Sequence, residues 1–139
     1  MTEKKQGFEV YFDTKNQIMK VEFYGAVHLK DIVDSLSTVI RHREFVKNMS
    51  ACYDFSNAVV EVDITGAEVV FHFLTGISDR RGTEYLLALV YSDEMTKALC
   101  DFYRLYFSRS KVDVETFMNK EVALEWIIES KKESTVSYL

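Results

Sequence analysis

The segment from Asp54 to Gly66 gathers short polar side chains in one part of the chain. These side chains belong to Asp54, Ser56, Asn57, Asp63 and Thr65. Carboxylates can act as general acids and bases, and a hydroxyl at a helix start is a position where an added phosphate changes the local charge strongly. Asp63 or Thr65 would also suit the cap of a following helix. We therefore expect residues 54–66 to form a recognition or switch surface.

No familiar catalytic or metal-binding signature accompanies these residues. The patterns GxGxxG, GxxxxGK[ST], HExxH and GxSxG are all absent. His28, His42 and His72 have no other histidine or cysteine at ligand spacing. Cys52 and Cys100 stand singly, without a CxxC pair. We therefore expect no metal, no cofactor and no disulfide, and the isolated cysteines indicate a reducing compartment.

Length and charge indicate a single soluble, cytoplasmic domain. The 139 residues are 47% hydrophobic, enough for a core that buries about two thirds of the unfolded surface. The chain has no proline and 5 scattered glycines, so residues 1–139 are predicted to form one domain with an ordered core over about 8–130. The 17 basic and 22 acidic residues give a net charge of -5, which argues against nucleic-acid binding. No stretch approaches the roughly 18 apolar residues of a membrane span.

Hydrophobic periodicity predicts the elements that must position the polar side chains. Apolar and polar residues alternate over 8–12 and 18–24, with turn-forming residues at 13–16, which predicts an antiparallel hairpin. Helical spacing of apolar residues predicts helices over about 29–42, 65–78, 93–109 and 120–130. Apolar runs predict further strands over 51–55, 85–91 and 112–115. The tail from 131 to 139 loses periodicity and is expected to fray.

This order of elements predicts an α/β fold. Right-handed crossovers place the strands after the hairpin in parallel, with helices packed on the sheet. The result is a five-stranded mixed sheet with about four helices, in which the first strand is antiparallel and lies at or near an edge. The continuous apolar run 85–91 is typical of a central strand covered on both faces. Ser92 or Asp93 would cap the third helix, and Asn119 the last.

Two further groups of residues have alternative interpretations. Arg80 and Arg81 could steer an anionic ligand, but a solvated basic turn is the simpler interpretation. The predicted third helix carries more aromatic residues than one buried stripe needs, namely Phe102, Tyr103, Tyr106 and Phe107. Excess apolar helix surface indicates an oligomer interface, an apolar pocket or simply a large core. We expect a homo-oligomer, with a dimer favoured, formed through these helix faces.

Several short stretches, spread over nearly the whole chain, carry a family resemblance. They are the start of the hairpin, Val21–Gly25, Cys52–Ser56, Asp63–Gly66 and Thr116–Trp126. These stretches resemble the STAS superfamily, specifically its SpoIIAA-like branch. The resemblance implies an anti-sigma-factor-antagonist-like fold and a regulatory, non-enzymatic role in which residues 54–66 meet a partner protein.

The same resemblance points to individual residues. In the superfamily, a strand ending in Asp-x-Ser leads to an Asp-Ser-[Ser/Thr]-Gly turn, and in the anti-sigma-factor antagonists a partner kinase phosphorylates the serine after the aspartate. Asp63, Thr65 and Gly66 match this turn, whereas Ile64 occupies the serine position and cannot accept phosphate. Thr65 is the candidate phosphorylation site that remains. The implied partner-binding residues are Asp54, Ser56, Asn57, Asp63, Thr65 and Gly66.

Two other functions stay open. SpoIIAA-like proteins are similar in fold to lipid-binding CRAL-TRIO domains, which implies an alternative role as a carrier or sensor of a small apolar ligand or lipid. A closed apolar cavity would favour that role. A third hypothesis is a hydrolase-like enzyme of unknown substrate with Asp54 and Asp63 as acid and base. Two carboxylates without a nucleophile, a metal or a phosphate loop define no reaction, so we expect no enzyme.

Overall fold

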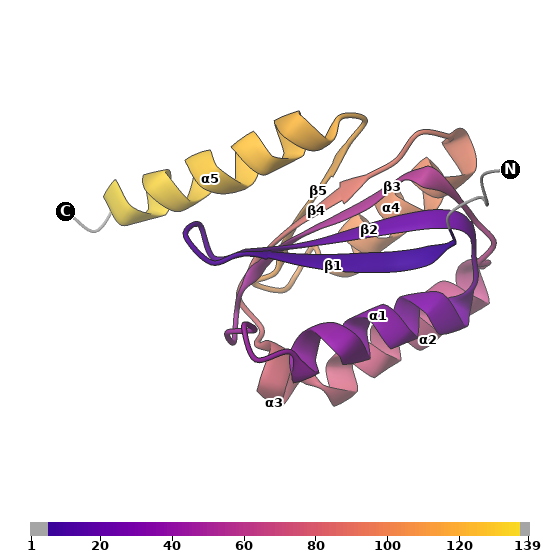
Figure 1. The fold of residues 1–139 in the computed structure, drawn as a ribbon, viewed down its shortest axis with the longest axis horizontal. Helices are drawn as coiled ribbons and strands as arrows, with labels where there is room; N and C mark the ends of the chain where they lie inside the picture. Colours follow the sequence, from indigo (N-terminus) through magenta and orange to yellow (C-terminus); the bar gives the residue numbers. More distant parts are fainter. Residues whose placement is uncertain (1–5, 137–139) are drawn as a thin grey trace, which may run out of the picture.

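The computed structural model describes residues 6–136, and the side chains of residues 6–132, as an α/β fold (Figure 1). The strands are β1 (Gly7–Asp13), β2 (Ile18–Val27), β3 (Ser50–Val60), β4 (Leu86–Val90) and β5 (Asp113–Phe117). The helices are α1 (Leu29–Arg41), α2 (Ile64–Gly76), α3 (Ser78–Arg81), α4 (Glu94–Tyr106) and α5 (Lys120–Val136). The predicted five-stranded mixed sheet is confirmed, and the additional fifth helix is the single turn α3.

The order of strands across the sheet is the same as their order in the chain, β1-β2-β3-β4-β5. β1 pairs antiparallel with β2, and every later pair is parallel. The edge position predicted for the first strand is therefore confirmed. The run 85–91 gives the interior strand β4, but the middle of the sheet belongs to β3, which is twice as long as predicted because it continues past residue 55.

Helices cover the two faces of the sheet unequally. On one face, α1, α2 and α4 pack over a large core that includes Phe23, Leu36 and Val70. On the other face, α5 is the one described helix that packs on β3, β4 and β5, around Ala123 and Ile127. Figure 1 shows α1 and α2 on one side of the sheet and α5 on the opposite side. The outer face of β1 and β2 is therefore the less covered part of the sheet.

The strands end at two different levels. Val90, the last residue of β4, is paired with Asp54, and Phe117, the last residue of β5, is paired with Val90. β3 continues to Val60 and stays paired with β2 as far as Val27. β2 and β3 thus project beyond the carboxyl ends of β4 and β5. Asp54 is the last residue of β3 that is paired with β4.

A tight contact joins the turn before β3 to the turn before β4. Asn48 N donates to Arg81 O at 2.9 Å, and Asn48 Oδ1 accepts from Glu84 N at 3.0 Å. Gly82 lies against Asn48 with a φ of 95°, a conformation that side chains rarely adopt. A Cβ atom on Gly82 would overlap the Asn48 side chain. Only glycine fits this position.

The tail predicted to fray from residue 131 is instead part of α5, which continues to Val136. Lys131 anchors this helix, because its Nζ donates to Asn16 O at 2.6 Å and to Gln17 O at 2.9 Å in the β1–β2 turn. Residues 137–139, the end of the predicted tail, lie outside the described part of the chain. No helix within residues 6–136 combines the length and the apolar character needed to cross a bilayer.

Candidate functional site

The structure divides the predicted recognition segment into two separate groups of residues. Because β3 continues to Val60, the loop predicted over 54–66 shrinks to residues 61–63. One group lies within β3: Asp54, Ser56 and Asn57. The other lies where α2 begins: Asp63, Thr65 and Gly66. Residues 54 to 60 span about 20 Å at the usual rise of a strand, so the prediction of a single polar cluster is wrong.

A β-bulge explains the longer strand. Glu22 is paired with Asp54 and Tyr24 with Asn57, so one more residue of β3 than of β2 lies between these pairs. Asp54 Oδ1 accepts from Ser56 N at 2.9 Å and from Ser56 Oγ at 2.6 Å, which holds the extra residue in place. Asp54 is only 6% exposed. Asp54 and Ser56 are therefore engaged with each other rather than presented to a partner.

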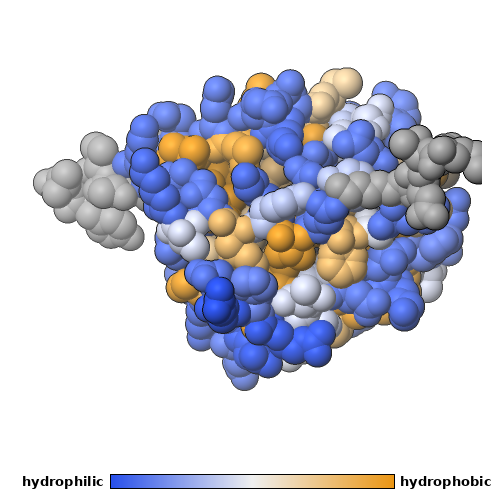
Figure 2. Space-filling model, viewed as in Figure 1, coloured by the Kyte–Doolittle hydropathy of each residue, from blue (hydrophilic) through white to orange (hydrophobic). Residues whose placement is uncertain are grey.

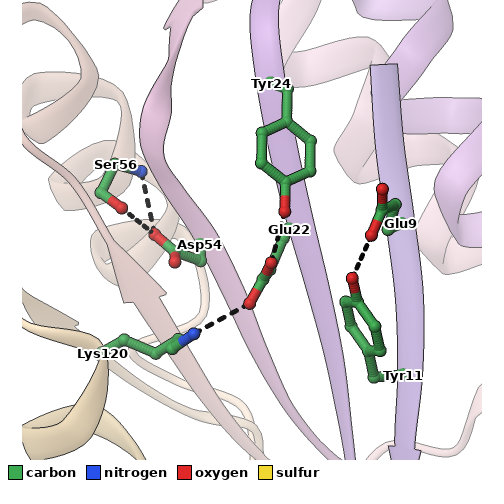
Figure 3. A network of polar contacts seen from close by, with 7 residues as sticks. All are labelled: Glu9, Tyr11, Glu22, Tyr24, Asp54, Ser56 and Lys120. Carbon is green, nitrogen blue, oxygen red and sulfur yellow. Dashed lines mark hydrogen bonds and ion pairs between the residues drawn. The ribbon is translucent and has the colours of Figure 1, made fainter. Parts of the chain in front are cut away.

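A polar network on the outer face of β1 and β2 was not anticipated from the sequence (Figure 3). Tyr11 OH donates to Glu9 on β1, and Tyr24 OH donates to Glu22 Oε2 on β2. Lys120 Nζ, at the start of α5, lies 2.9 Å from Glu22 Oε1. The alternation of residue types gave these side chains a common face, but only the placement of α5 brings Lys120 to them.

Hydrogen bonding sets the protonation of this network. The hydroxyl of Tyr24 and then the ammonium of Lys120 lower the pKa of Glu22. Conversely, the bond to Glu22 raises the pKa of Tyr24 to about 12, and the bond to Glu9 raises that of Tyr11 to about 12. The tyrosines are therefore neutral donors at physiological pH. Tyr11 is still 41% exposed, so this face is open to solvent.

A second feature is an open groove of about 1430 Å³ where α2 and α4 begin, here termed the α2–α4 groove. Asp63 caps α2 by accepting from Gly66 N at 2.8 Å, and Asp93 caps α4 by accepting from Thr96 N at 2.8 Å. In both predicted caps the aspartate is thus the capping residue. Six of the lining residues are Val59, Ile64, Thr65, Met95, Phe102 and Leu105.

The α2–α4 groove combines exposed apolar side chains with carboxylates. Ile64 is 60% exposed and Met95 73% exposed, and Val59 and Leu105 are exposed as well. Four acidic residues also line it: Glu61, Asp63, Asp93 and Asp101. Among the described residues, its lining includes no lysine or arginine. This combination of apolar surface and negative charge fits a protein surface better than a small anion.

A small apolar cavity lies in the core between the sheet and α1, α2 and α4. It measures about 60 Å³, and its lining includes Leu36, Tyr53, Leu89 and Tyr103. Tyr103 OH is not free to bind a ligand there, because it donates to Ala67 O at 3.1 Å. Ligand pockets usually measure about 300–1,000 Å³. The cavity is therefore much smaller than a pocket for a lipid.

The prediction of a solvated basic turn is wrong for Arg81, although Arg80 is exposed. Its side chain is 2% exposed, and its guanidinium lies 3.4 Å from the centre of the Tyr85 ring and 5.7 Å from that of Phe45. Burial lowers its pKa. Arg81 Nη1 has no hydrogen-bond partner within the described structure. The sequence signals a charge at this position but not the two rings that enclose it.

The proposed acid and base of the hydrolase-like hypothesis do not form a pair. Asp54 is on β3 beside Ser56, and Asp63 caps α2 at the far end of the same strand. General acid and base groups must both reach the reacting atoms. Within residues 6–132, no three His, Cys, Asp or Glu side chains are grouped as the ligands of a metal would be.

Two solved structures that share this fold are similar to the chain over most of its length. An uncharacterised protein of the DUF3478 family with a SpoIIAA-like fold, from Shewanella loihica PV-4, gives a TM-score of 0.58 at 11% identity, covering 91% of this chain and 98% of its own. The anti-sigma factor antagonist SpoIIAA in its unphosphorylated form gives a TM-score of 0.52 at 13% identity. This match covers 87% of this chain and 97% of the SpoIIAA chain. No protein-family model and no curated protein matches the sequence. The predicted SpoIIAA-like fold is confirmed.

Proposed function

We propose that this chain is a non-enzymatic, regulatory interaction module of the cytoplasm that binds a partner protein in the α2–α4 groove. The observation that carries the proposal is the exposure of Ile64 and Met95 beside the capping carboxylates Asp63 and Asp93. Large exposed apolar patches with polar surroundings mark interaction sites. The similarity in fold to SpoIIAA supports a regulatory role.

The composition of the groove also defines the chemistry of the partner. Of the four carboxylates, Asp101 is already paired with Lys97 at 2.9 Å. The charges of Glu61, Asp63 and Asp93 favour positive charge in the partner, and the apolar side chains favour an apolar stripe. An amphipathic helix with basic flanking residues meets both conditions. We therefore propose such a helix as the segment of the partner that occupies the groove.

Ile64 determines what kind of regulation the groove supports. It is the first residue of α2, and its exposed side chain is apolar where the resembling turn carries a serine. Ile64 therefore contributes contact area rather than a phosphate. Thr65 is exposed next to it and stays the candidate phosphorylation site. A phosphate on Thr65 would add negative charge to a groove that is already acidic.

Selection from a displayed peptide library tests the proposal. The immobilised protein is the target, and the Ile64→Asp/Met95→Asp variant removes peptides that bind elsewhere. We expect enriched peptides to combine apolar residues at i, i+3 or i+4 and i+7 with lysine or arginine, and to bind the variant at least tenfold more weakly in calorimetry. Met118→Asp is the matched control, since Met118 is 72% exposed and does not line the groove. Equal binding to the wild type and the groove variant would reject the site.

A further inference from the structure

The edge strand β1 has few of the features that normally keep an exposed strand edge from pairing with another chain. It pairs with β2 over its full seven residues, from Gly7–Tyr24 to Asp13–Ile18, without a bulge. It contains no lysine and no proline. Natural edge strands use bulges, lysines, prolines or inward-pointing charges to avoid such pairing. Of these features, β1 has only the acidic side chains of Glu9 and Asp13.

The core-side residues of β1 are also incompletely buried. Phe8, Val10 and Phe12 pack against the core, but each remains partly exposed. Figure 2 shows hydrophobic surface gathered in the middle of the view, over β1, between strongly hydrophilic regions. The opposite edge differs, because β5 is two residues shorter and its Glu115 binds Arg104 of α4. The incompletely buried apolar side chains therefore lie at the β1 edge of the sheet.

The sequence of β1 is complementary to itself when two copies run antiparallel. With a twofold axis at Val10, the residues of one copy face those of the other in the pairs Gly7–Asp13, Phe8–Phe12, Glu9–Tyr11 and Val10–Val10. The apolar pairs lie on the core side and the Glu9–Tyr11 pairs on the outer face. A tyrosine hydroxyl can donate to a carboxylate, so the Glu9–Tyr11 pairs across the axis are chemically complementary. No like charges face each other.

Other registers of the same pairing are unfavourable. A shift of one residue places the apolar residues of one copy opposite the polar face of the other. A shift of two residues keeps the faces but sets Glu9 opposite either Glu9 or Asp13 of the second copy. Like charges directly opposite destabilise a strand pair. The register centred on Val10 satisfies both conditions and pairs all seven residues of the strand, whereas a shift of four residues would pair only three.

We propose that β1 pairs with β1 of a second copy of this chain, antiparallel and centred on Val10. The two five-stranded sheets then form one continuous sheet across a twofold axis, with the same surface used by both copies. This interface differs from the aromatic helix faces expected from the sequence. It also leaves the α2–α4 groove free in both copies, because that groove lies on other elements.

Charge substitutions on the outer face test the pairing without touching the core. Sedimentation should give a wild-type mass twice the 16.2 kDa of one chain. The Glu9→Lys/Tyr11→Lys variant places ammonium groups opposite each other and should halve that mass. The matched variant Glu9→Lys/Tyr11→Glu keeps opposite charges across the axis and should restore the dimer. Circular dichroism checks that each variant is folded.

Cysteine cross-linking tests the register. Paired residues in antiparallel strands have Cα atoms about 4.5–5.5 Å apart, within the range of a disulfide. Val10→Cys should therefore give a disulfide-linked dimer on mild oxidation. Tyr11→Cys is the control, since the two Tyr11 positions are diagonal neighbours at about 7–8 Å, too far apart for a disulfide. Cys52 and Cys100 are buried, so neither should take part in the cross-link.

Each of three outcomes would overturn the proposal. The first is a monomeric wild type across the micromolar range. The second is a dimer that survives the Glu9→Lys/Tyr11→Lys substitutions, which would place the interface elsewhere. The third is a dimer in which Val10→Cys cross-links no faster than Tyr11→Cys, which would exclude this register.

Discussion

Lys120, the first residue of α5, forms an ion pair with Glu22 in the middle of β2, with Nζ 2.9 Å from Oε1. The two residues are 98 positions apart in the chain. The pair ties the start of α5 to the outer face of the sheet, while Lys131 ties the same helix to the β1–β2 turn. Two lysines thus connect α5 to β2 and to the β1–β2 turn.

Removing this ion pair should change the titration of Glu22. In Lys120→Met, the pKa of Glu22 should rise but stay below its ordinary value, because the Tyr24 hydroxyl still donates to it. A carboxyl whose pKa is lowered by folding adds stability above its unfolded pKa, and that stability is lost as pH falls through the folded pKa. The variant should therefore be less stable by under about 1 kcal/mol at neutral pH and equal to the wild type in acid.

Carboxyl NMR titration and urea unfolding at several pH values measure both effects. Lys132→Met is the control, because Lys132 pairs with the exposed Glu129 and lies far from Glu22 along α5. An unchanged pKa of Glu22 in Lys120→Met would show that the ion pair does not persist in solution.

Asp54 should matter for stability through the bulge in β3. Asp54→Ala leaves the Ser56 N–H and hydroxyl without their acceptor, which should cost about 2–3 kcal/mol. Asp54→Asn keeps an oxygen at the same position and should lose clearly less. Ser56→Ala removes one of the two bonds and should cost about 1 kcal/mol. Urea unfolding measures all three, and equal losses for Asp54→Ala and Asp54→Asn would contradict the role assigned to the acceptor.

The buried guanidinium of Arg81 should be replaceable by an apolar side chain of similar length. Burying a charge without an opposite partner is costly. The free energy of unfolding of Arg81→Met should therefore lie within about 1 kcal/mol of the wild-type value or exceed it. Arg81→Ala removes the packing on Tyr85 and should lose about 2–4 kcal/mol. If both variants lose the same amount in thermal unfolding, the cation–π contact itself carries the stability.

Two glycines should respond oppositely to alanine. Gly82→Ala introduces a Cβ that overlaps Asn48 at a left-handed backbone position and should cost more than about 1 kcal/mol. Gly76→Ala, at the end of α2, meets nothing within 4 Å and should stabilise by about 0.4–1 kcal/mol. Urea unfolding compares the two, and a neutral Gly82→Ala would show that the Asn48 turn is adaptable.

The elements with one buried face were predictable from the sequence. Met19, Val21 and Phe23 are fully buried and alternate along β2, so a period of two was visible in the chain. Leu36 and Val39 likewise mark the buried stripe of α1. In such elements the residues that the apolar pattern predicts to be buried are the residues that are buried in the structure.

The end of β3 was not predictable for a physical reason. Ala58 and Val60 are buried and alternate with exposed neighbours, so the second half of the strand has the usual pattern. The bulge shifts that pattern by one residue and leaves two polar residues, Ser56 and Asn57, in succession. Two adjacent polar residues after an apolar run are typical of a turn. The sequence therefore predicts one loop where the structure has a continued strand.

The remaining parts of the site depend on contacts between distant segments. The α2–α4 groove exists because Asp63 and Asp93 start their helices at adjacent places on the sheet, which no local pattern reveals. The enclosure of Arg81 requires Phe45 and Tyr85 from two other segments. The residue types predict the charge of Arg81 and the helix caps Asp63 and Asp93. What each of these residues contacts depends on the tertiary structure.

The strands lie in the sheet in the same order as in the chain, which has a consequence for folding during synthesis. The β1–β2 hairpin is the first part of the sheet to be synthesised, and each later strand can then join the free edge left by its predecessor. No strand has to enter between two that are already paired. A nascent chain can therefore extend its sheet in the direction of its own synthesis, one strand and one crossover at a time.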